Sequence, residues 1–82
     1  MFEIKLLLNK IDDIKACNEA ARGCEGIVRA YDDTYVVDAK SVMGLFSLNL
    51  STPIMIKFDT EKDQDDFMKT ARAEMNNSCF IS

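Results

Sequence analysis

The most informative segment of this 82-residue chain reads Lys40-Ser41-Val42-Met43-Gly44-Leu45-Phe46-Ser47-Leu48. A serine directly before a mostly apolar run can cap a helix, because its hydroxyl accepts a hydrogen bond from a backbone N–H of the first turn. We therefore predict a short helix over residues 42–48 with Ser41 as its N-cap. Gly44 weakens such a helix by up to about 1 kcal/mol relative to alanine, so packing must hold it.

Strands are predicted on both sides of this short helix. Before it, residues 27–31 and 35–39 are rich in Ile, Val and Tyr, which favour strands. The polar residues 32–34 between them indicate a hairpin. After it, a turn over residues 49–53 leads to residues 54–58, in which apolar side chains alternate at the period of a strand with one buried face.

The N-terminal part predicts another strand and a longer helix. Residues 2–8 alternate in the same way as a half-buried strand. Residues 11–22 carry apolar side chains at helical spacing. Asn9 is expected to cap this helix, with the acidic Asp12 near the positive end of its dipole. Gly23 is the expected stop, since glycine tolerates the left-handed conformation that ends many helices.

A last helix is predicted to begin after Thr60, whose hydroxyl can cap it, and to end near residues 76–77. The tail, residues 78–82, contains Phe80 and Ile81, which can fold back onto the domain. The first half of the helix contains the acidic residues Asp63, Asp65 and Asp66. We interpret these acids as a solvated face that complements the helix dipole, because the stretch lacks the glycine turn and distant glutamate of a calcium loop.

The resulting order is β-α-β-β-α-β-α. Strands that alternate apolar and polar residues suit an antiparallel sheet with one face under helices and the other in water. We predict a two-layer, open-faced α+β sandwich that forms a single domain over residues 1–82. A chain of this length has no room for a second core.

Residues 40–48 closely resemble K-S-[IV]-M-G-[VIL]-[MF]-S-L, the signature of HPr, the small phosphocarrier of the bacterial sugar phosphotransferase system. Chain length and element order also resemble HPr from about residue 2 to residue 76. The resemblance implies an HPr-like fold: a four-stranded antiparallel sheet in the order 1-4-2-3, covered on one face by three helices. It implies a phosphocarrier-like or regulatory protein and no enzyme.

The chain departs from HPr at the phosphoryl acceptor. HPr uses a histidine in a G-[IL]-H-A-R-P-A segment, whereas residues 8–14 here contain no histidine, arginine or proline. Lys10 and Asp12 are the possible occupants of this degenerate acceptor region. A lysine amine is protonated near neutral pH, and the adjacent carboxylates of Asp12 and Asp13 repel an incoming phosphate. We expect no phosphohistidine, and we interpret the two acids as helix starters.

The resemblance also assigns roles around the short helix. Ser41 matches the serine that HPr kinase phosphorylates in many Gram-positive bacteria. The helix N-terminus and the positive charge of Lys40 stabilise the negative charge of a phosphate at this position. We predict a partner-binding set of Lys40, Val42, Met43 and Phe46, although Val42 is also expected to contact the core. Met43 and Phe46 match the family's docking patch, and for these two the docking and core interpretations both stay open.

Composition narrows the classes of partner and reaction. Ten basic and fourteen acidic residues give a net charge of −4, which disfavours nucleic acid as a partner. No segment approaches the roughly 20 apolar residues of a membrane span, and no signal peptide is visible, so we expect a cytoplasmic protein. The chain contains no histidine, which is the usual ligand of zinc sites and the usual base of hydrolase triads. We predict no metal and no other cofactor.

The three cysteines, Cys17, Cys24 and Cys79, show no recurring spacing that would indicate a disulfide framework. If Cys17 and Cys24 share one helix, they lie about 10 Å apart, beyond the roughly 7 Å that a disulfide spans. We predict that all three are buried, free thiols.

Three functions stay open. The preferred one is a regulatory or protein-binding HPr-like protein that engages phosphotransferase components, HPr kinase or a catabolite-control transcription regulator. The second is a phosphocarrier with a different acceptor, such as Lys10, Asp12 or Asp13. The third is an unrelated interaction module on the same fold, since a fold alone does not determine function.

Overall fold

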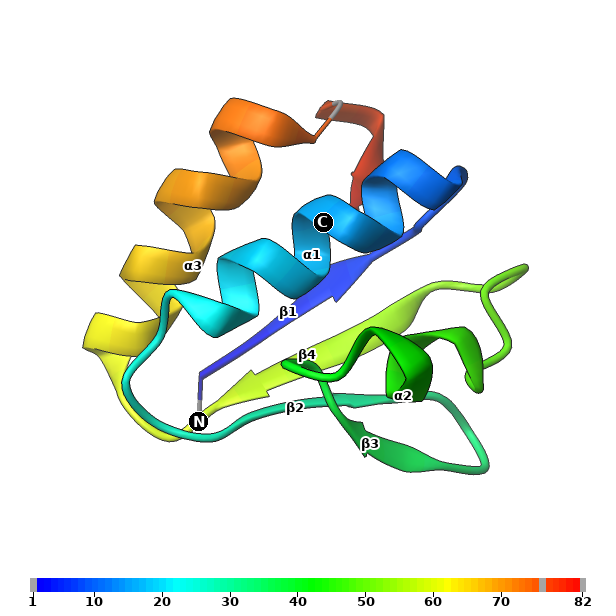
Figure 1. Ribbon diagram of the computed structural model, residues 1–82, viewed down its shortest axis with the longest axis horizontal. Coiled ribbons are helices and arrows are strands. Elements are labelled where there is room, and N and C mark those ends of the chain that lie inside the picture. The colour runs from blue at the N-terminus through cyan, green and yellow to red at the C-terminus, as the bar shows by residue number, and fades with distance from the viewer. Residues whose placement is uncertain (1, 76, 82) are drawn as a thin grey trace.

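The computed structural model describes residues 2–75 and 77–81, which form one sheet with helices packed against it (Figure 1). The strands are β1 (Phe2–Leu6), β2 (Val28–Tyr31), β3 (Val36–Asp38), β4 (Ile54–Phe58) and β5 (Phe80–Ile81). The helices are α1 (Ile11–Arg22), α2 (Val42–Phe46), α3 (Glu61–Glu74) and the short 3-10 helix η1 (Asn77–Cys79). The predicted α+β class is therefore confirmed.

The sheet is antiparallel throughout, with the strand order β3-β2-β4-β1-β5. The prediction of four strands was wrong, because the tail adds β5 at the edge of β1. Leu6 pairs with Phe80, and the Leu7 amide donates to the Cys79 carbonyl at 2.8 Å. The tail folds back because Cys79 becomes fully buried and Phe80 packs against the core.

The strand register sorts side chains onto two faces. Ile56 of β4 lies between Ile4 of β1 and Ala30 of β2, and Val37 of β3 continues this row under the helices. The neighbouring row contains Glu3, Lys57, Arg29 and Asp38, all at least partly exposed. The alternation predicted for the strands thus separates a buried apolar face from a polar face.

The core joins the sheet to all three α-helices. Its largest fully buried side chains are Phe58, Phe67, Leu6, Leu45, Ile54, Ile56, Val28, Cys17 and Cys79. The rings of Phe58 and Phe67 meet edge to face with centroids 5.2 Å apart, which anchors α3 on β4. Each such side chain contributes about 1.5–3 kcal/mol through burial, so these contacts position the helices.

Several element ends differ from the predicted ones. β1 stops at Leu6 instead of residue 8, where the backbone turns toward η1. α2 stops at Phe46 instead of residue 48, because the Ser47 hydroxyl donates to the Gly44 carbonyl at 2.6 Å and helps to end the helix. α3 stops at Glu74; the predicted end included residue 76, which lies outside the described residues.

The three cysteines are free and buried, as predicted. Burial raises the pKa of the Cys17 thiol to about 12. Burial, followed by the nearby carboxylates of Asp63 and Asp66, also raises the pKa of Cys24. Across residues 2–75 and 77–81, no helix has the length and apolar character to cross a bilayer.

Candidate functional site

Ser41 caps α2, as predicted from the sequence. Its Oγ accepts a hydrogen bond from the Gly44 amide at 3.3 Å, and the Leu45 amide donates to the Ser41 carbonyl at 3.1 Å. The Ser41 side chain is exposed. A hydroxyl in this position stabilises the first turn and stays accessible to a modifying enzyme.

The apolar residues of α2 divide between the core and the surface. Leu45 is fully buried and Val42 packs partly against the core. Met43 is 76% exposed and Phe46 is 46% exposed, so both present apolar atoms to solvent. An exposed methionine beside an aromatic side chain is typical of adaptable protein-binding surfaces. We call Ser41, Met43 and Phe46 the α2 surface.

Gly44 allows α2 to lie close to β3. A Cβ atom at this position would lie 3.2 Å from the Val37 Cβ and 3.3 Å from the Asp38 carbonyl oxygen. The same glycine that weakens the isolated helix therefore permits its tight packing. A carboxylate supports the other end of α2, since Asp32 accepts the Asn49 amide at 2.9 Å.

The pKa of Asp32 lies below its ordinary value because its carboxylate accepts backbone N–H groups. The strongest of these contributions comes from Asn49, followed by Tyr35 and Thr34. Both of the latter amides lie 2.7 Å from the carboxylate. Asp32 thus joins the β2–β3 turn to the segment that follows α2.

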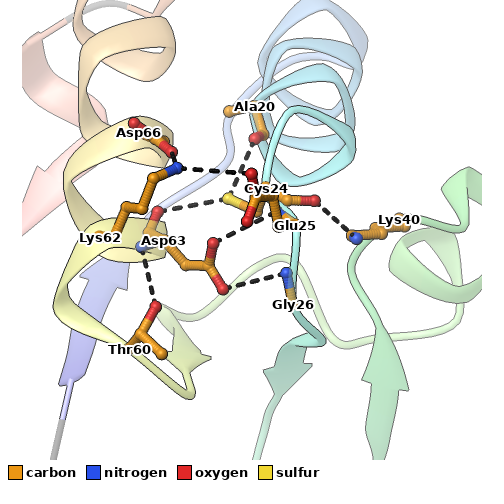
Figure 2. Close-up of polar contacts among 9 residues, drawn as sticks. All are labelled: Ala20, Cys24, Glu25, Gly26, Lys40, Thr60, Lys62, Asp63 and Asp66. Carbon is orange, nitrogen blue, oxygen red and sulfur yellow. Dashed lines mark hydrogen bonds and ion pairs between the residues drawn. The ribbon is translucent and has the colours of Figure 1, made fainter.

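Lys40 has a structural partner. Its ammonium donates to the Cys24 carbonyl at 2.8 Å, and its backbone amide donates to the Asp38 carboxylate at 2.8 Å. Nearby, the Asn18 side chain donates to the Ala39 carbonyl at 3.2 Å. Asn18 therefore ties the segment before α2 to the second half of α1, and Lys40 ties it to the loop that follows α1 (Figure 2 shows Lys40 and Cys24).

The degenerate acceptor region at the start of α1 is arranged differently from the prediction. The N-cap is Lys10, not Asn9, and the reciprocal acid is Asp13, not Asp12. The buried Asp13 carboxylate accepts the amides of Asn9 and Lys10, each at 3.1 Å. The side chains of Lys10 and Asp12 are exposed. Asp13 thus acts as a structural acceptor for the backbone.

Asp63 is a buried polar residue that the sequence interpretation missed. It is 3% exposed, so its assignment to a solvated face was wrong. Its carboxylate accepts the amides of Glu25 at 3.2 Å and Gly26 at 3.1 Å (Figure 2). The Thr60 hydroxyl accepts the Asp63 amide at 3.2 Å. The spacing of threonine and aspartate was the available signal, because an acid three residues after a cap is placed to accept backbone N–H groups.

The chemical abilities of these groups differ. Ser41 offers an exposed hydroxyl beside the amides of a helix start, whereas the carboxylates of Asp13 and Asp63 each accept two backbone amides. Within the described part of the chain, no three acidic or thiol side chains converge as metal ligands. The arrangement is therefore suited to modification and protein binding at α2.

Comparison of the chain with protein-family models, with curated proteins and with solved structures finds no significant match.

Proposed function

We propose that this chain is an HPr-like protein that binds other proteins of the sugar phosphotransferase system through α2 and does not carry phosphohistidine. The observation that carries the proposal is the exposure of Met43 and Phe46 beside the N-cap Ser41. The resemblance of residues 40–48 to the HPr signature supports the family assignment in this proposal, and the absence of histidine from the chain removes the usual carrier chemistry.

Phosphorylation of Ser41 is the proposed means of regulation. A phosphoserine carries about −1.5 to −2 charge at neutral pH, which the amide end of a helix favours. The hydroxyl now accepts one amide of α2, and a phosphate in its place offers three acceptor oxygens to the same turn. The added charge lies next to Met43 and changes the α2 surface from apolar to mixed.

HPr kinase with ATP provides the test. We expect the intact chain to gain one phosphoryl group, detected by mass measurement, and Ser41→Ala to gain none. Ser47→Ala is the matched control, because it removes the other serine hydroxyl next to α2 and should leave the modification in place. Met43→Ala with Phe46→Ala should lower kcat/KM by about 30-fold or more, since apolar anchors of a docking surface each contribute about 1–2 kcal/mol and the double variant loses both. An unmodified wild-type chain would contradict the proposal.

A carrier with another acceptor is less well supported. Asp13 already accepts two backbone amides, and a phosphorylated Asp13 would lose that arrangement. Asp12 and Lys10 are exposed. The carboxylate of Asp12 repels an incoming phosphate, and the amine of Lys10 is protonated near neutral pH. The test of the carrier is transfer of a labelled phosphoryl group from phosphoenolpyruvate through the general phosphotransferase enzyme. A protein-bound label that is lost in acid or on treatment with hydroxylamine would favour the carrier. An interaction module unrelated to sugar transport would bind none of these enzymes.

A further inference from the structure

β3 forms one outer edge of the sheet, since the strand order β3-β2-β4-β1-β5 places β2 on one side of it. Within residues 2–75 and 77–81, no strand pairs with the other side of β3. The opposite edge of the sheet differs, because β5 pairs there with β1. Figure 1 shows β3 at the border of the molecule, beside α2. β3 is therefore an edge to which another chain has access.

The backbone groups of Val36 point away from β2, toward this edge. The Asp32 amide donates to the Tyr35 carbonyl at 3.1 Å, and the Ala39 amide donates to the Val28 carbonyl at 2.9 Å. Tyr35 and Ala39 thus face β2, and the alternation of an antiparallel ladder directs the Val36 amide and carbonyl outward. Val36 is also 66% exposed, so solvent reaches it at the edge.

The chain itself engages backbone groups on both sides of Val36. The Ser41 amide donates to the Asp38 carbonyl at 3.0 Å, and the Thr34 amide donates to the Asp32 carboxylate at 2.7 Å. Val36 keeps both its amide and its carbonyl for a partner, whereas the residues two positions before and after it each have one such group engaged. Pairing with a further strand is therefore best centred on Val36.

Apolar side chains lie beside the edge on both faces of the sheet. Val36 pairs with Tyr31, one residue along from the row that contains Val37, so it lies on the polar face. Tyr35 lies on the same face as Val37, toward the helices, and is 59% exposed. An exposed valine and an exposed aromatic ring thus flank the edge on opposite faces.

We propose that the β3 edge binds a second copy of the same chain, with the two β3 strands antiparallel and a two-fold axis at Val36. The two Val36 residues then exchange both of their backbone hydrogen bonds. Tyr35 of each copy lies opposite Val37 of the other in a non-hydrogen-bonded pair, where side chains approach more closely. Opposed aromatic and β-branched side chains stabilise antiparallel strands.

Charge and the engaged backbone groups select this register and favour a second copy as the occupant. An axis at Val36 places Asp38 opposite Thr34 of the second copy, so like charges do not face each other directly. An axis at Asp38 would place the two Asp38 carboxylates together. An axis at Val37 would need the Asp38 carbonyl, which already accepts the Ser41 amide. The edge is therefore complementary to itself about Val36.

The same surface of each copy forms this contact, so the assembly closes at a dimer. Because β3 contains three residues, we expect the dimer to form at high protein concentration. The dimer does not depend on the function proposed for α2, since its hydrogen bonds and side-chain pairs come from β3.

Sedimentation velocity of the full chain, between about 20 µM and about 1 mM, tests the proposal. We expect a reversible rise in mass toward twice that of one chain. Val36→Lys should weaken association about tenfold, because it removes an apolar pair and places two like charges opposite each other at the axis. Ile11→Lys is the matched control: Ile11 is 60% exposed and begins α1, which Figure 1 shows well apart from β3, so the change should alter association less than twofold.

Amide hydrogen exchange locates the contact. The outward Val36 amide should exchange more slowly as the dimer fraction rises, whereas the Val37 amide faces β2 and should depend little on concentration. Val36→Pro removes the outward amide and no hydrogen bond to β2, so it should abolish the dimer while far-UV circular dichroism stays native-like. If Val36→Pro does not fold, Val36→Lys and the exchange of the wild-type Val36 amide decide.

Four results would overturn the proposal. They are a monomer at 1 mM, equal effects of Val36→Lys and Ile11→Lys, a folded Val36→Pro variant that still dimerises, and a Val36 amide whose exchange does not depend on concentration. A dimer that Met43→Ala with Phe46→Ala weakens as much as Val36→Lys does would place the contact on α2 and would also contradict the β3 interface.

Discussion

Asp63 shows how one buried carboxylate can organise a loop. It belongs to the first turn of α3, but its oxygens accept the amides of Glu25 and Gly26, 38 and 37 residues earlier in the chain. A buried acid is tolerated when such donors replace its hydration. The Cys24 thiol strengthens the same junction by donating to the Asp63 carbonyl at 3.3 Å.

Replacement of Asp63 should therefore destabilise the protein. We expect Asp63→Ala to lower the free energy of unfolding by about 2–3 kcal/mol, because two hydrogen bonds to a charged acceptor are lost and two amides lose their partner. Urea denaturation measures the effect. Asp65→Ala is the control on the same helix; its side chain is exposed, so its effect should stay within about 0.5 kcal/mol. Equal losses in the two variants would show that Asp63 has no special structural role.

Two glycines between α1 and β2, Gly23 and Gly26, have different structural roles. Gly23 is the C-cap of α1, so the predicted stop is confirmed, but its φ of −76° and ψ of −10° are right-handed, so the left-handed conformation expected there was wrong. Among the described residues, no glycine has a positive φ. Gly26 is required for another reason: a Cβ atom there would lie 2.5 Å from an Asp63 carboxylate oxygen.

The two glycines should respond in opposite ways to alanine. Gly23→Ala should raise the free energy of unfolding by about 0.4–1 kcal/mol, because the native backbone suits alanine and the unfolded chain loses freedom. The new Cβ has room, since its nearest neighbour is the Ala20 carbonyl oxygen at 3.5 Å. Gly26→Ala should lower stability, because Asp63 must move. Thermal unfolding of both variants tests this pair, and destabilisation by Gly23→Ala would restore the left-handed interpretation.

At the scale of the whole molecule, the core lies on one side of the sheet, which explains why one face of the sheet is apolar and the other is polar. Helices cover Ile4, Ile56 and Ala30, whereas Glu3 and Arg29 lie on the polar face. All three cysteines belong to this core: Cys17 and Cys79 are fully buried, and Cys24 is 4% exposed.

Thiol reactivity should therefore track unfolding. Iodoacetamide reacts with thiolates, and burial both excludes the reagent and raises the pKa of Cys17 to about 12. We expect slow labelling of all three thiols in native buffer, with a rate that rises with urea in parallel with the unfolded population. Ser51→Cys is the control, because residue 51 is exposed and its thiol should react at once. Fast labelling of the wild-type protein without urea would contradict the buried positions.

Features that depend on neighbours in the chain were predicted well. The bounds of α1, the caps Ser41 and Thr60, and the alternation of β4 follow from local hydrogen bonding and periodicity. The candidate site was predicted in part: Ser41 was identified as a cap, whereas the sequence did not decide between core and surface for Met43 and Phe46. In the sequence of a short helix, a buried and an exposed apolar residue look alike until the direction of the sheet is known.

The sequence by itself determined the α+β class, the short helix that begins after Ser41 and the lack of an imidazole for phosphoryl transfer. Only the tertiary structure decided that the tail becomes β5, that Lys40 binds the Cys24 carbonyl and that Asp63 is buried. The physical reason is distance along the chain. These partners lie from 16 to more than 70 residues apart, so their hydrogen bonds form only after packing has brought the elements together.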